Sequence, residues 1–368
     1  MTVYYVAKTG DDGNAGTTLG APKLTIANAC AVADGGAGNV VEIIDSGVYS
    51  EGDIAIYTNA ITVRATGSNT PIMDGTSGNN DYAFTSNASG NVFQGLIMRN
   101  YDDGLVNSFG WPPNGYDFKL LGCTGHFIAG PQQIGAGGNA EVQNCKIVSD
   151  TRTTFTPYGN YKIWFNNSVI ATNAEGYHCI DSAQSRTAVT ASFCTFIGSG
   201  YGSGRNNNLV NQVYKVINCI VSGSGDGINA NTSTYNLVNV SGDPFIAWSG
   251  DDYDGTARSA NTGEITGDPK FTSGTLPAYD PTFPGVDFGK ANTQNYSLLE
   301  GSPAIDAGTA YGGITTDIIG TARSSPDIGA YEVAAGGYAN EVLGVESGDI
   351  GKVLDVETAE IEKVMGVE

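Results

Sequence analysis

The stretch Leu120-Leu121-Gly122-Cys123 is followed by four related stretches along the chain. They read Val142-Gln143-Asn144-Cys145, Phe165-Asn166-Asn167-Ser168, Ser192-Phe193-Cys194 and Val216-Ile217-Asn218-Cys219. Each ends in a small residue that carries sulfur or oxygen, and these end residues lie 22, 23, 26 and 25 positions apart. A period in the low twenties, with strand-like sequence and no helix between the repeats, indicates a β-solenoid, in which the chain winds into stacked coils.

The overall composition is typical of a chain built from strands and turns. The 368 residues include 52 Gly and 19 Tyr, 40% are hydrophobic, and only 15% are charged. Gly, Asn, Ser and Thr favour turns, whereas the helix-forming residues Lys, Glu and Leu are sparse. A globular chain usually has about one quarter charged residues, so we expect an all-β protein with a largely uncharged polar surface.

The charge balance is strongly acidic. The chain has 17 basic and 38 acidic residues, a net charge of −21 and an isoelectric point of about 4.2. Such a surface repels phosphate backbones and anionic lipids. We therefore expect neither nucleic acid nor a membrane as a partner.

The N-terminal sequence and the cysteines predict the compartment. Residues 1–6 lack a basic segment followed by an apolar run, so we expect no signal peptide and synthesis in a cytoplasm. Four of the six Cys fall in the repeating column, and Cys30 falls in a predicted helix. We expect buried thiols rather than disulfides, although stacked coils would bring Cys123 and Cys145 within bridging range.

The pattern divides the chain into four segments. Residues 1–60 should form an N-terminal cap and first coil, with a helix over 23–33 acting as a lid. Residues 61–240 should form the coils, 241–335 the last coils and a closing module, and 336–368 a tail. Strands are expected at Ile61–Ala65, Asn91–Met98, Asp117–Gly122, Ala140–Val148, Lys162–Ala171, Ala188–Ile197 and Gln212–Val221.

Three asparagines directly precede the repeating column, namely Asn144, Asn167 and Asn218. We expect them to point inward and to bond one another along the axis of the coils, as amides do in asparagine ladders. A structural role is predicted for them rather than a functional one.

The N-terminal segment resembles a known family. Tyr4-Tyr5-Val6, Ala21-Pro22, Thr25-Ile26, Ala29, Val40–Ile43 and Gly47-Val48-Tyr49 are similar to the opening of right-handed parallel β-helix proteins of the pectin-lyase-like superfamily. The resemblance implies an all-β, single-stranded right-handed parallel β-helix with a short N-terminal capping helix. It names a fold rather than a reaction, because this fold carries many functions.

A second resemblance covers about sixty residues near the C-terminus. Ser302-Pro303-Ala304-Ile305-Asp306 and Pro326-Asp327-Ile328-Gly329-Ala330-Tyr331-Glu332 are similar to a module that follows parallel β-helices in many bacterial surface and phage proteins. We expect Asp306 and Asp327 to cap turns and Arg323 to pair with a carboxylate. The module should then close the last coil.

The C-terminal tail has a separate repeat of 11 residues. Glu341–Glu346 recurs as Lys352–Glu357 and as Lys363–Glu368. Its Gly and Val content favours short strands over a helix, and so short a segment cannot bury its own apolar residues. We expect a small β tail for assembly or anchoring, formed by Val342, Leu343, Val345, Ile350, Val353, Leu354, Val356, Ile361, Val364, Met365 and Val367. Similar short repeats occur at the ends of bacteriophage virion proteins.

Few residues suggest catalysis. Glu175, His178 and Asp181 lie within seven positions and offer a base and two carboxylates, the groups used in glycan cleavage. Strand alternation, however, places His178 with Ile180 on one face and Cys179 with Asp181 on the other. We expect no metal and no cofactor; Asp251, Asp252 and Asp254 could supply oxygen ligands to Ca²⁺, but a solvated acidic turn is the favoured interpretation.

Aromatic residues cluster in predicted loops among uncharged polar residues. Trp111, Tyr158, Tyr161 and Trp164 are the candidates for glycan binding, because the C–H faces of sugars stack on aromatic rings. The alternative is that these rings cover the edges of the coils.

Together these features predict a bacteriophage virion protein: a capsid decoration, head fibre or tailspike whose rigid β-helix contacts a host-surface polysaccharide. The tail would attach it to other virion proteins or join copies into a homotrimer. One alternative is a polysaccharide lyase or glycoside hydrolase of the β-helix class, and another is a bacterial adhesin. We favour a non-enzymatic role.

Overall fold

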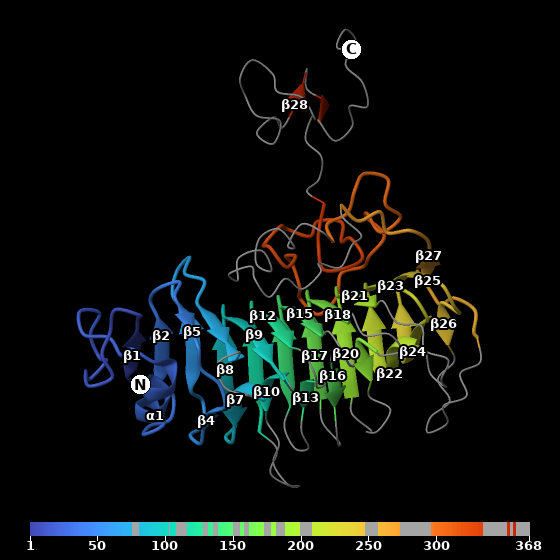
Figure 1. The fold of residues 1–368 in the computed structure, drawn as a ribbon. Coiled ribbons are helices and arrows are strands. Elements are labelled where there is room, and N and C mark those ends of the chain that lie inside the picture. The colour runs from blue at the N-terminus through green and yellow to red at the C-terminus, as the bar shows by residue number, and fades with distance from the viewer. Residues whose placement is uncertain are drawn as a thin grey trace.

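The computed structural model describes residues 1–75, 81–102, 104–107, 116–127, 132–134, 139–149, 155–157, 162–172, 178–181, 188–198, 208–246, 257–272, 296–333, 352–353 and 356–357. Within these residues the chain forms parallel strands wound into stacked coils, with one α-helix, α1 (Ile26–Ala33). The coils follow one another along a single axis (Figure 1). The predicted right-handed parallel β-helix is confirmed.

Each coil contributes a strand to the first sheet, whose strands pair in parallel along the axis. The first sheet contains β1 (Val3–Val6), β2 (Val40–Ile43), β5 (Thr62–Ala65), β8 (Asn91–Gln94), β11 (Phe118–Leu121), β14 (Ala140–Gln143), β17 (Lys162–Asn166), β20 (Ala188–Ser192), β22 (Asn208–Ile217), β24 (Asp226–Thr234) and β26 (Phe245–Ile246).

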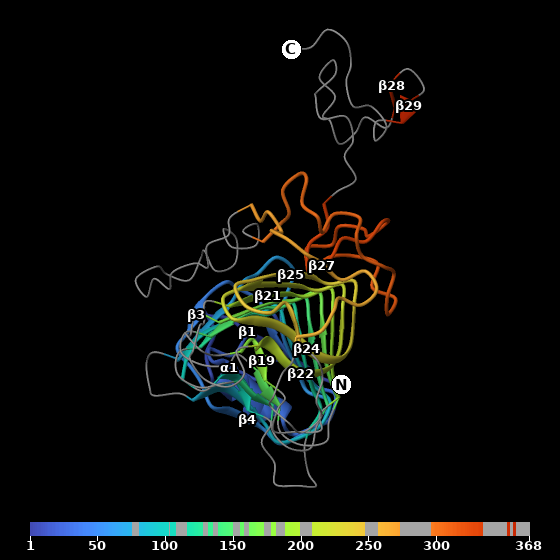
Figure 2. The ribbon, with the colours of Figure 1, turned by 90° about the vertical axis from the view of Figure 1, so that its right-hand side faces the viewer.

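The second sheet meets the first at a sharp corner. It contains β3 (Val48–Tyr49), β6 (Ile72–Asp74), β9 (Ile97–Tyr101), β12 (Thr124–Phe127), β15 (Lys146–Ser149), β18 (Val169–Thr172), β21 (Thr195–Gly198), β23 (Ile220–Gly223), β25 (Leu237–Val240) and β27 (Ile265–Thr266). The view along the axis shows the coils one behind another (Figure 2).

The third side is made of two runs of strands. The first run is β4 (Ile54–Ile56), β7 (Tyr82–Ser86) and β10 (Gly104–Asn107); the second is β13 (Gln132–Ile134), β16 (Phe155–Pro157) and β19 (Ile180–Asp181). The long strand β22 joins the second run to the first sheet, because Val210 pairs with Ile180 of β19 and Lys215 pairs with Thr190 of β20.

The core runs through the middle of the coils. In-register neighbours such as Leu120, Val142 and Phe165 stack at 0% exposure and continue through Ala191 and Val216. At the N-terminal end, α1 adds buried residues to the same core. The Glu51 carboxylate accepts hydrogen bonds from the first helical amides, Ile26 N at 3.0 Å and Ala27 N at 2.7 Å. This end-capping helix was predicted, although it begins three residues later than expected.

The repeating column lies inside the corner between the first and second sheets. All six Cys are free and buried. Along the column, Cys123 N donates to Cys145 Sγ at 3.4 Å, Cys145 N to Ser168 Oγ at 3.2 Å, and Cys194 N to Cys219 Sγ at 3.4 Å. At the end of the series, Cys219 N donates to Asn236 Oδ1 at 2.8 Å. Sulfur or oxygen is favoured in this column because Cys145, Ser168 and Cys219 each accept a buried amide of the preceding coil.

The strands predicted across this corner are each divided in two. Ala140–Val148, for example, becomes β14 and β15, because Asn144 adopts a left-handed conformation with φ of 55°. The equivalent residue of every described coil from β8 onwards also has positive φ: Gly95, Gly122, Asn144, Asn167, Phe193, Asn218 and Tyr235. We call this line of residues the turn row. Left-handed backbone is the conformation that Gly and Asn adopt most readily.

The predicted inward asparagine ladder is wrong. Asn167 Nδ2 donates to Thr316 O at 2.7 Å, and Asn218 Nδ2 donates to Thr309 O at 2.7 Å. The left-handed turn directs the next residue inward, so the asparagine amides meet a different part of the chain. The column residues, rather than the asparagines, form the ladder along the axis.

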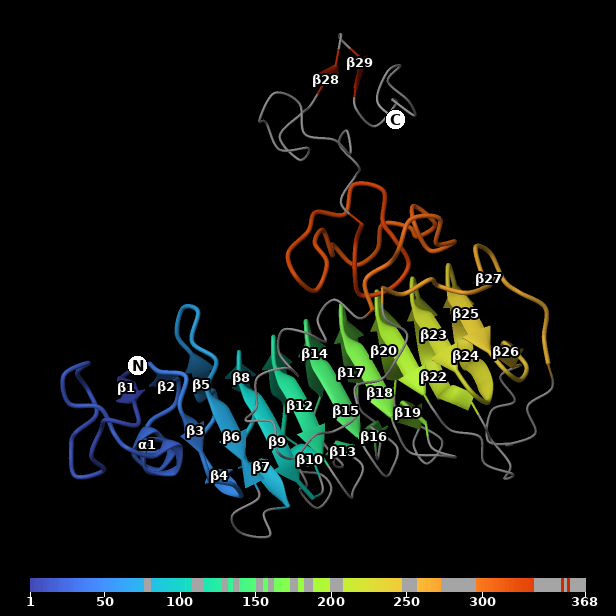
Figure 3. The same ribbon diagram turned by 45° about the horizontal axis from the view of Figure 1, so that its top comes forward.

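The C-terminal module, residues 296–333, lies along the second sheet (Figure 3). Its Tyr296, Ala330 and Tyr331 pack on the outward side chains of β15, β18 and β21, and its Leu298, Ala304 and Ile328 pack on those of β23 and β25. Gly329 approaches so closely that an added Cβ would lie 2.7 Å from Ile220 Cδ1. The expectation that the module closes the last coil is therefore corrected: it covers a flank, because the second sheet is apolar on both faces.

The tail is described at four residues. β28 (Lys352–Val353) pairs antiparallel with β29 (Val356–Glu357), and Val353 lies opposite Val356. The other residues predicted to form the assembly tail lie outside the described residues.

Candidate functional site

The predicted acid–base group is only partly described. Glu175 lies outside the described residues. Asp181 on β19 is half-buried and accepts a hydrogen bond from Asn211 Nδ2 at 3.0 Å, and His178 is half-buried. The predicted alternation is wrong, because Cys179 and Ile180 are both fully buried. The strand begins only at Ile180, so Cys179 turns inward before regular alternation starts.

Of the four predicted glycan-binding aromatics, Trp111, Tyr158 and Tyr161 lie outside the described residues. Trp164 is described, and it lies in strand β17 rather than in a loop. It is 37% exposed on the outer face of the first sheet. A strand holds its ring more rigidly than a loop would.

Residues in register along the axis surround Trp164. One row on this outer face runs Val92, Lys119, Glu141, Trp164, Thr190, Lys215 and Thr232. A second row, two residues further along each strand, runs Arg64, Gln94, Leu121, Gln143, Asn166, Ser192, Ile217 and Thr234. We call this surface the first-sheet face. Consecutive residues of a row are separated by about 4.8 Å, the spacing of neighbouring strands.

The first-sheet face differs in charge from the whole protein. It carries Arg64, Lys119, Lys162 and Lys215, with Glu42 and Glu141 as acidic residues of the same strands. Two ion pairs form there: Arg64 with Glu42, and Lys119 Nζ with Glu141 Oε2 at 2.5 Å. The face therefore has a local excess of positive charge on a protein whose net charge is −21.

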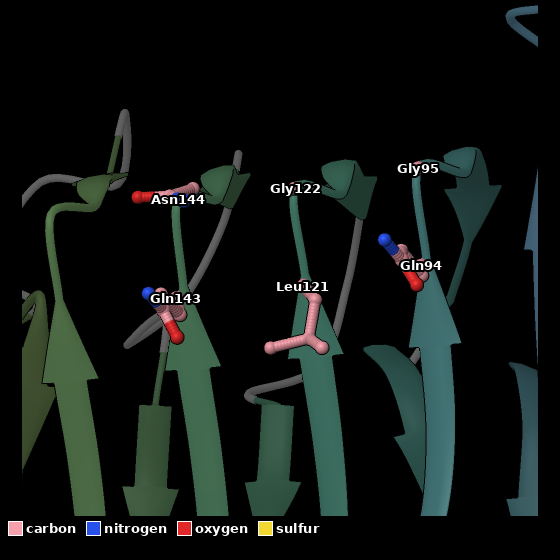
Figure 4. Close-up of a pocket in the computed structure, with 6 residues that line it drawn as sticks. All are labelled: Gln94, Gly95, Leu121, Gly122, Gln143 and Asn144. Carbon is pink, nitrogen blue, oxygen red and sulfur yellow. The ribbon is translucent and has the colours of Figure 1, made fainter. Parts of the chain in front are cut away.

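A shallow groove of about 330 Å³ lies where the first-sheet face meets the turn row. Figure 4 shows Gln94, Leu121 and Gln143 on successive strands and Gly95, Gly122 and Asn144 at the turns. None of these six residues is charged. The Asn144 Oδ1 atom is buried and has no hydrogen-bond partner.

The charged residues of the C-terminal module form a buried cluster. Arg323 donates to Glu332 Oε2 at 2.8 Å and to Asn167 Oδ1 at 3.2 Å, and its guanidinium lies 4.3 Å from the centre of the Phe193 ring. Asp327 accepts from Asp306 N at 2.8 Å and from Val333 N at 2.6 Å. The expected pairing of Arg323 and the turn-capping role of Asp327 are confirmed. Burial raises the pKa of Glu332 to about 6 and lowers the pKa of Arg323.

These charged groups have a structural role, because their side chains are buried and form hydrogen bonds within the protein. The side chain of Arg323 is 0% exposed and that of Glu332 is 4% exposed. Arg323 therefore holds the module against Asn167 and Phe193 of the coils. A catalytic carboxylate has to reach its substrate, and Glu332 is closed off from one.

The structure describes neither the predicted Ca²⁺ ligands nor, among its described residues, a metal-binding cluster. Asp251, Asp252 and Asp254 lie outside the described residues. Among the residues that the structure describes, no group of three or more His, Cys, Asp or Glu is arranged to hold a metal ion. In the described part of the chain, no helix is both long and apolar enough to span a membrane.

Sequence patterns alone missed several polar residues of this surface. Lys119, Glu141, Gln94 and Gln143 were not singled out, because each is an ordinary polar residue in its own strand. Their common signal is position: each lies one or three residues before a residue of the turn row in its coil. Aligning the repeats on the column would have placed them in the two rows.

No family model and no curated protein matches the sequence. Among solved structures, the chain is similar to pectate lyase Pel9A at 15% identity, over 90% of this chain and 96% of that chain, with a TM-score of 0.45. A pectin methylesterase from Aspergillus niger is 16% identical over 78% of this chain and 95% of that chain, with a TM-score of 0.39. A rhamnogalacturonan lyase is 15% identical over 65% of this chain and 74% of that chain, with a TM-score of 0.38.

Proposed function

We propose that the protein binds a polysaccharide along the first-sheet face, with Trp164 as the stacking platform. The observation that carries the proposal is the exposed indole of Trp164 on a rigid strand, between Glu141 and Thr190 of the neighbouring coils. An exposed ring flanked by hydrogen-bonding groups suits a sugar, which presents apolar C–H faces and polar hydroxyls together.

The regular spacing of the face supports this proposal. Each coil advances by about 4.8 Å, which is close to the length of one pyranose ring. A polysaccharide lying along the axis would therefore meet equivalent polar positions at successive sugars. The second row offers Asn166 on the Trp164 strand, with Gln143 and Ser192 on the two neighbouring strands, and Ser192 Oγ donates to Asn166 Oδ1 at 2.6 Å.

The local charge favours a glycan that carries carboxylate groups. Lys162 lies on the same strand and the same face as Trp164, and Lys119 lies two coils away. Cations on the face attract an anionic chain, whereas the acidic remainder of the surface repels it. Binding should therefore be oriented along this face and should weaken as salt is added.

The test is binding of immobilised polysaccharides, neutral and acidic, to the full chain. Trp164→Ala should weaken binding about tenfold, the loss expected for one stacked aromatic ring. Tyr57→Ala is the matched control, because Tyr57 is 68% exposed but lies near the N-terminal helix. Equal affinity of wild type and Trp164→Ala for every ligand bound would exclude the proposal.

We also propose that this glycan-binding rod belongs to a bacteriophage virion and attaches through the tail of residues 336–368. The support is the 11-residue apolar repeat of the tail and its resemblance to the ends of virion proteins. Other virion proteins and further copies of the chain, as a homotrimer, are the partners in this proposal. Mass spectrometry of purified virions is the direct test, and absence from the particle would contradict it.

A second candidate function is glycan cleavage at β19. Asp181 is held by Asn211, which fixes the position of its carboxylate, and the half-buried His178 lies three residues earlier in the chain. If the protein cleaves the polysaccharide it binds, Asp181→Asn should abolish product release and leave binding unchanged. If the wild type releases no product from any glycan that it binds, this candidate function is excluded.

A further inference from the structure

The turn row is already a binding surface within the protein. Asn218 forms two hydrogen bonds with the main chain of one module residue: its Nδ2 donates to Thr309 O at 2.7 Å, and its Oδ1 accepts from Thr309 N at 2.9 Å. The main chain of Gly329 also donates to Asn218 O at 2.8 Å. Two coils earlier, Asn167 Nδ2 donates to Thr316 O at 2.7 Å. These asparagine side chains of the turn row thus bind main-chain groups of the module, whatever side chains the bound residues carry.

The bound module segment follows the row. Between Thr309 and Thr316 the chain passes from the coil of Asn218 to that of Asn167, towards the N-terminal end of the helix. It then leaves the row at Asp317, whose carboxylate accepts from Ile319 N at 3.0 Å and Thr321 N at 2.7 Å and so turns the chain away. Among the described residues, no hydrogen bond joins the module to the next row residue, Asn144.

The groove beside Asn144 continues the same surface. It spans the coils of Gly95, Gly122 and Asn144, and its lining offers the amides of Gln94, Gln143 and Asn144 without any charge. Asn144 has the same left-handed backbone as Asn167 and Asn218, with φ of 55°, 46° and 54°. Its Oδ1 is buried without a hydrogen-bond partner, and its side chain carries the same amide Nδ2 that serves as the donor in the other two asparagines.

We propose that this groove binds the main chain of an extended, uncharged peptide segment from a partner protein. Asn144 would donate to one of its carbonyl groups, as Asn167 and Asn218 do to the module. Gln94 and Gln143 would bond further main-chain groups, and the absence of a side chain at Gly95 lets a backbone approach closely. The ligand would run along the axis, in line with the segment Thr309–Thr316.

A peptide fits these observations better than a sugar. The module shows that an asparagine at this backbone position pairs with a peptide group, and no aromatic ring lines the groove to stack on a sugar face. The charges that favour an acidic glycan lie further from the corner, on the first-sheet face. Gln143 belongs to both surfaces, but Asn144 and Gly122, the two residues changed in the test, line the groove alone.

The experiment uses the full chain and a synthetic peptide with the sequence of residues 307–316, which contains no charged residue. A fluorescent label on the peptide reports binding by anisotropy. Asn144→Gly should bind about fivefold more weakly, because it removes one amide–carbonyl hydrogen bond. The fold should persist, because Gly122 and Gly95 occupy the same turn in the two preceding coils.

A gain-of-binding variant makes the test two-sided. Gly122→Asn adds an amide to the open part of the row, at a position where an added Cβ meets no atom within 4 Å and where Asn tolerates the φ of 61°. It should bind the peptide several-fold more tightly than the wild type. A peptide of the same composition in scrambled order should bind within about twofold, since the main chain is what is recognised.

Three results would overturn the proposal. The first is that the wild type does not bind the peptide. The second is that Asn144→Gly and Gly122→Asn both bind the peptide with the same affinity as the wild type. The third is that a neutral oligosaccharide, maltohexaose, binds in an Asn144-dependent manner while the peptide does not, which would identify the groove as a sugar site. Circular dichroism and melting temperature of both variants confirm that any change arises in the folded protein.

Discussion

At the scale of single residues, Phe193 shows how one position serves two parts of the molecule. Its φ of 52° is unfavourable for a bulky side chain, and Asn or Gly occupies this turn in most other coils. The ring, however, lies 4.3 Å from the guanidinium of Arg323, which also bonds Asn167 and Glu332. A cation stacked on a buried ring offsets the strain of the turn.

Arg323 should be among the residues most important for stability. Arg323→Met leaves Glu332 buried without its partner, so the free energy of unfolding should fall by about 3–5 kcal/mol. The double variant Arg323→Met with Glu332→Gln should recover part of this loss, because no charge then remains unpaired. Urea denaturation of the wild type, of Arg323→Met and Glu332→Gln, and of the double variant measures the coupling. Strictly additive losses would show that the two side chains do not stabilise each other.

Glu332 should make stability depend on pH. Its pKa in the folded protein is about 6, above the ordinary value of 4.5, because burial disfavours the charged form. The folded state therefore holds its proton over a range in which the unfolded state releases it. The contribution to stability is present below about pH 4.5 and is lost as pH rises to 6, by about 2 kcal/mol.

Glu332→Gln provides the comparison for this pH effect. The variant should have a flatter dependence of unfolding free energy on pH between 4.5 and 6 than the wild type, measured by chemical denaturation at several pH values. Parallel curves for the two proteins would mean that Glu332 titrates as it does in the unfolded chain.

At the scale of elements, the coil corner is stabilised by a ladder of buried hydrogen bonds rather than by packing alone. Ser168 Oγ accepts from Cys145 N at 3.2 Å and donates to Asn166 O at 2.8 Å. The thiols of Cys145 and Cys219 accept equivalent bonds, and burial raises the pKa of both thiols. A thiol or a hydroxyl can therefore accept the amide hydrogen bond at these column positions, whereas an alkyl group cannot.

Ser168→Ala should therefore destabilise the protein by about 1–3 kcal/mol, because the buried amide of Cys145 loses its acceptor. Ser168→Cys keeps an acceptor of the kind found in the neighbouring coils and should cost less. Thermal unfolding of both variants distinguishes the two cases. A smaller loss for Ala than for Cys would show that side-chain size, rather than bonding, governs the column.

At the scale of the whole molecule, the second sheet depends on the C-terminal module for cover. The outward residues Val148, Val169 and Ile197 are at most 6% exposed because Tyr296 and Tyr331 lie over them. Without the module these strands would present a continuous apolar surface. Exposed surfaces of this kind drive association.

Two truncations should have opposite effects. A chain ending at residue 336 retains the module, so it should fold as the full chain does and lose only assembly, measured by light scattering and incorporation into particles. A chain ending at residue 272 uncovers the second sheet and should aggregate or bind a hydrophobic dye. If the chain ending at residue 336 still oligomerises as the wild type does, the role of the tail is contradicted. If the chain ending at residue 272 stays soluble and does not bind the dye, the role of the module is contradicted.

Much of the fold could be predicted because the signal is local and repeated. The column of Cys123, Cys145 and Ser168 gave the period, and Pro22 with Gly35-Gly36 bounded the helix to within three residues. The candidate site was harder to predict. Trp164 was identified as an aromatic residue, but its neighbours Glu141 and Thr190 lie 23 and 26 positions away in sequence and meet it only through strand pairing.

The sequence by itself determined that this chain winds into stacked coils, which residues line the column, and that α1 caps the first end. Each of these follows from periodicity and from hydrogen bonding between equivalent positions of neighbouring coils. Only the tertiary structure decided that the asparagines of the turn row face outward, that the module covers a flank, and that Trp164 lies on a positively charged face. Those outcomes depend on contacts between segments as far as 156 residues apart, such as Asn167 with Arg323, and no local pattern encodes them.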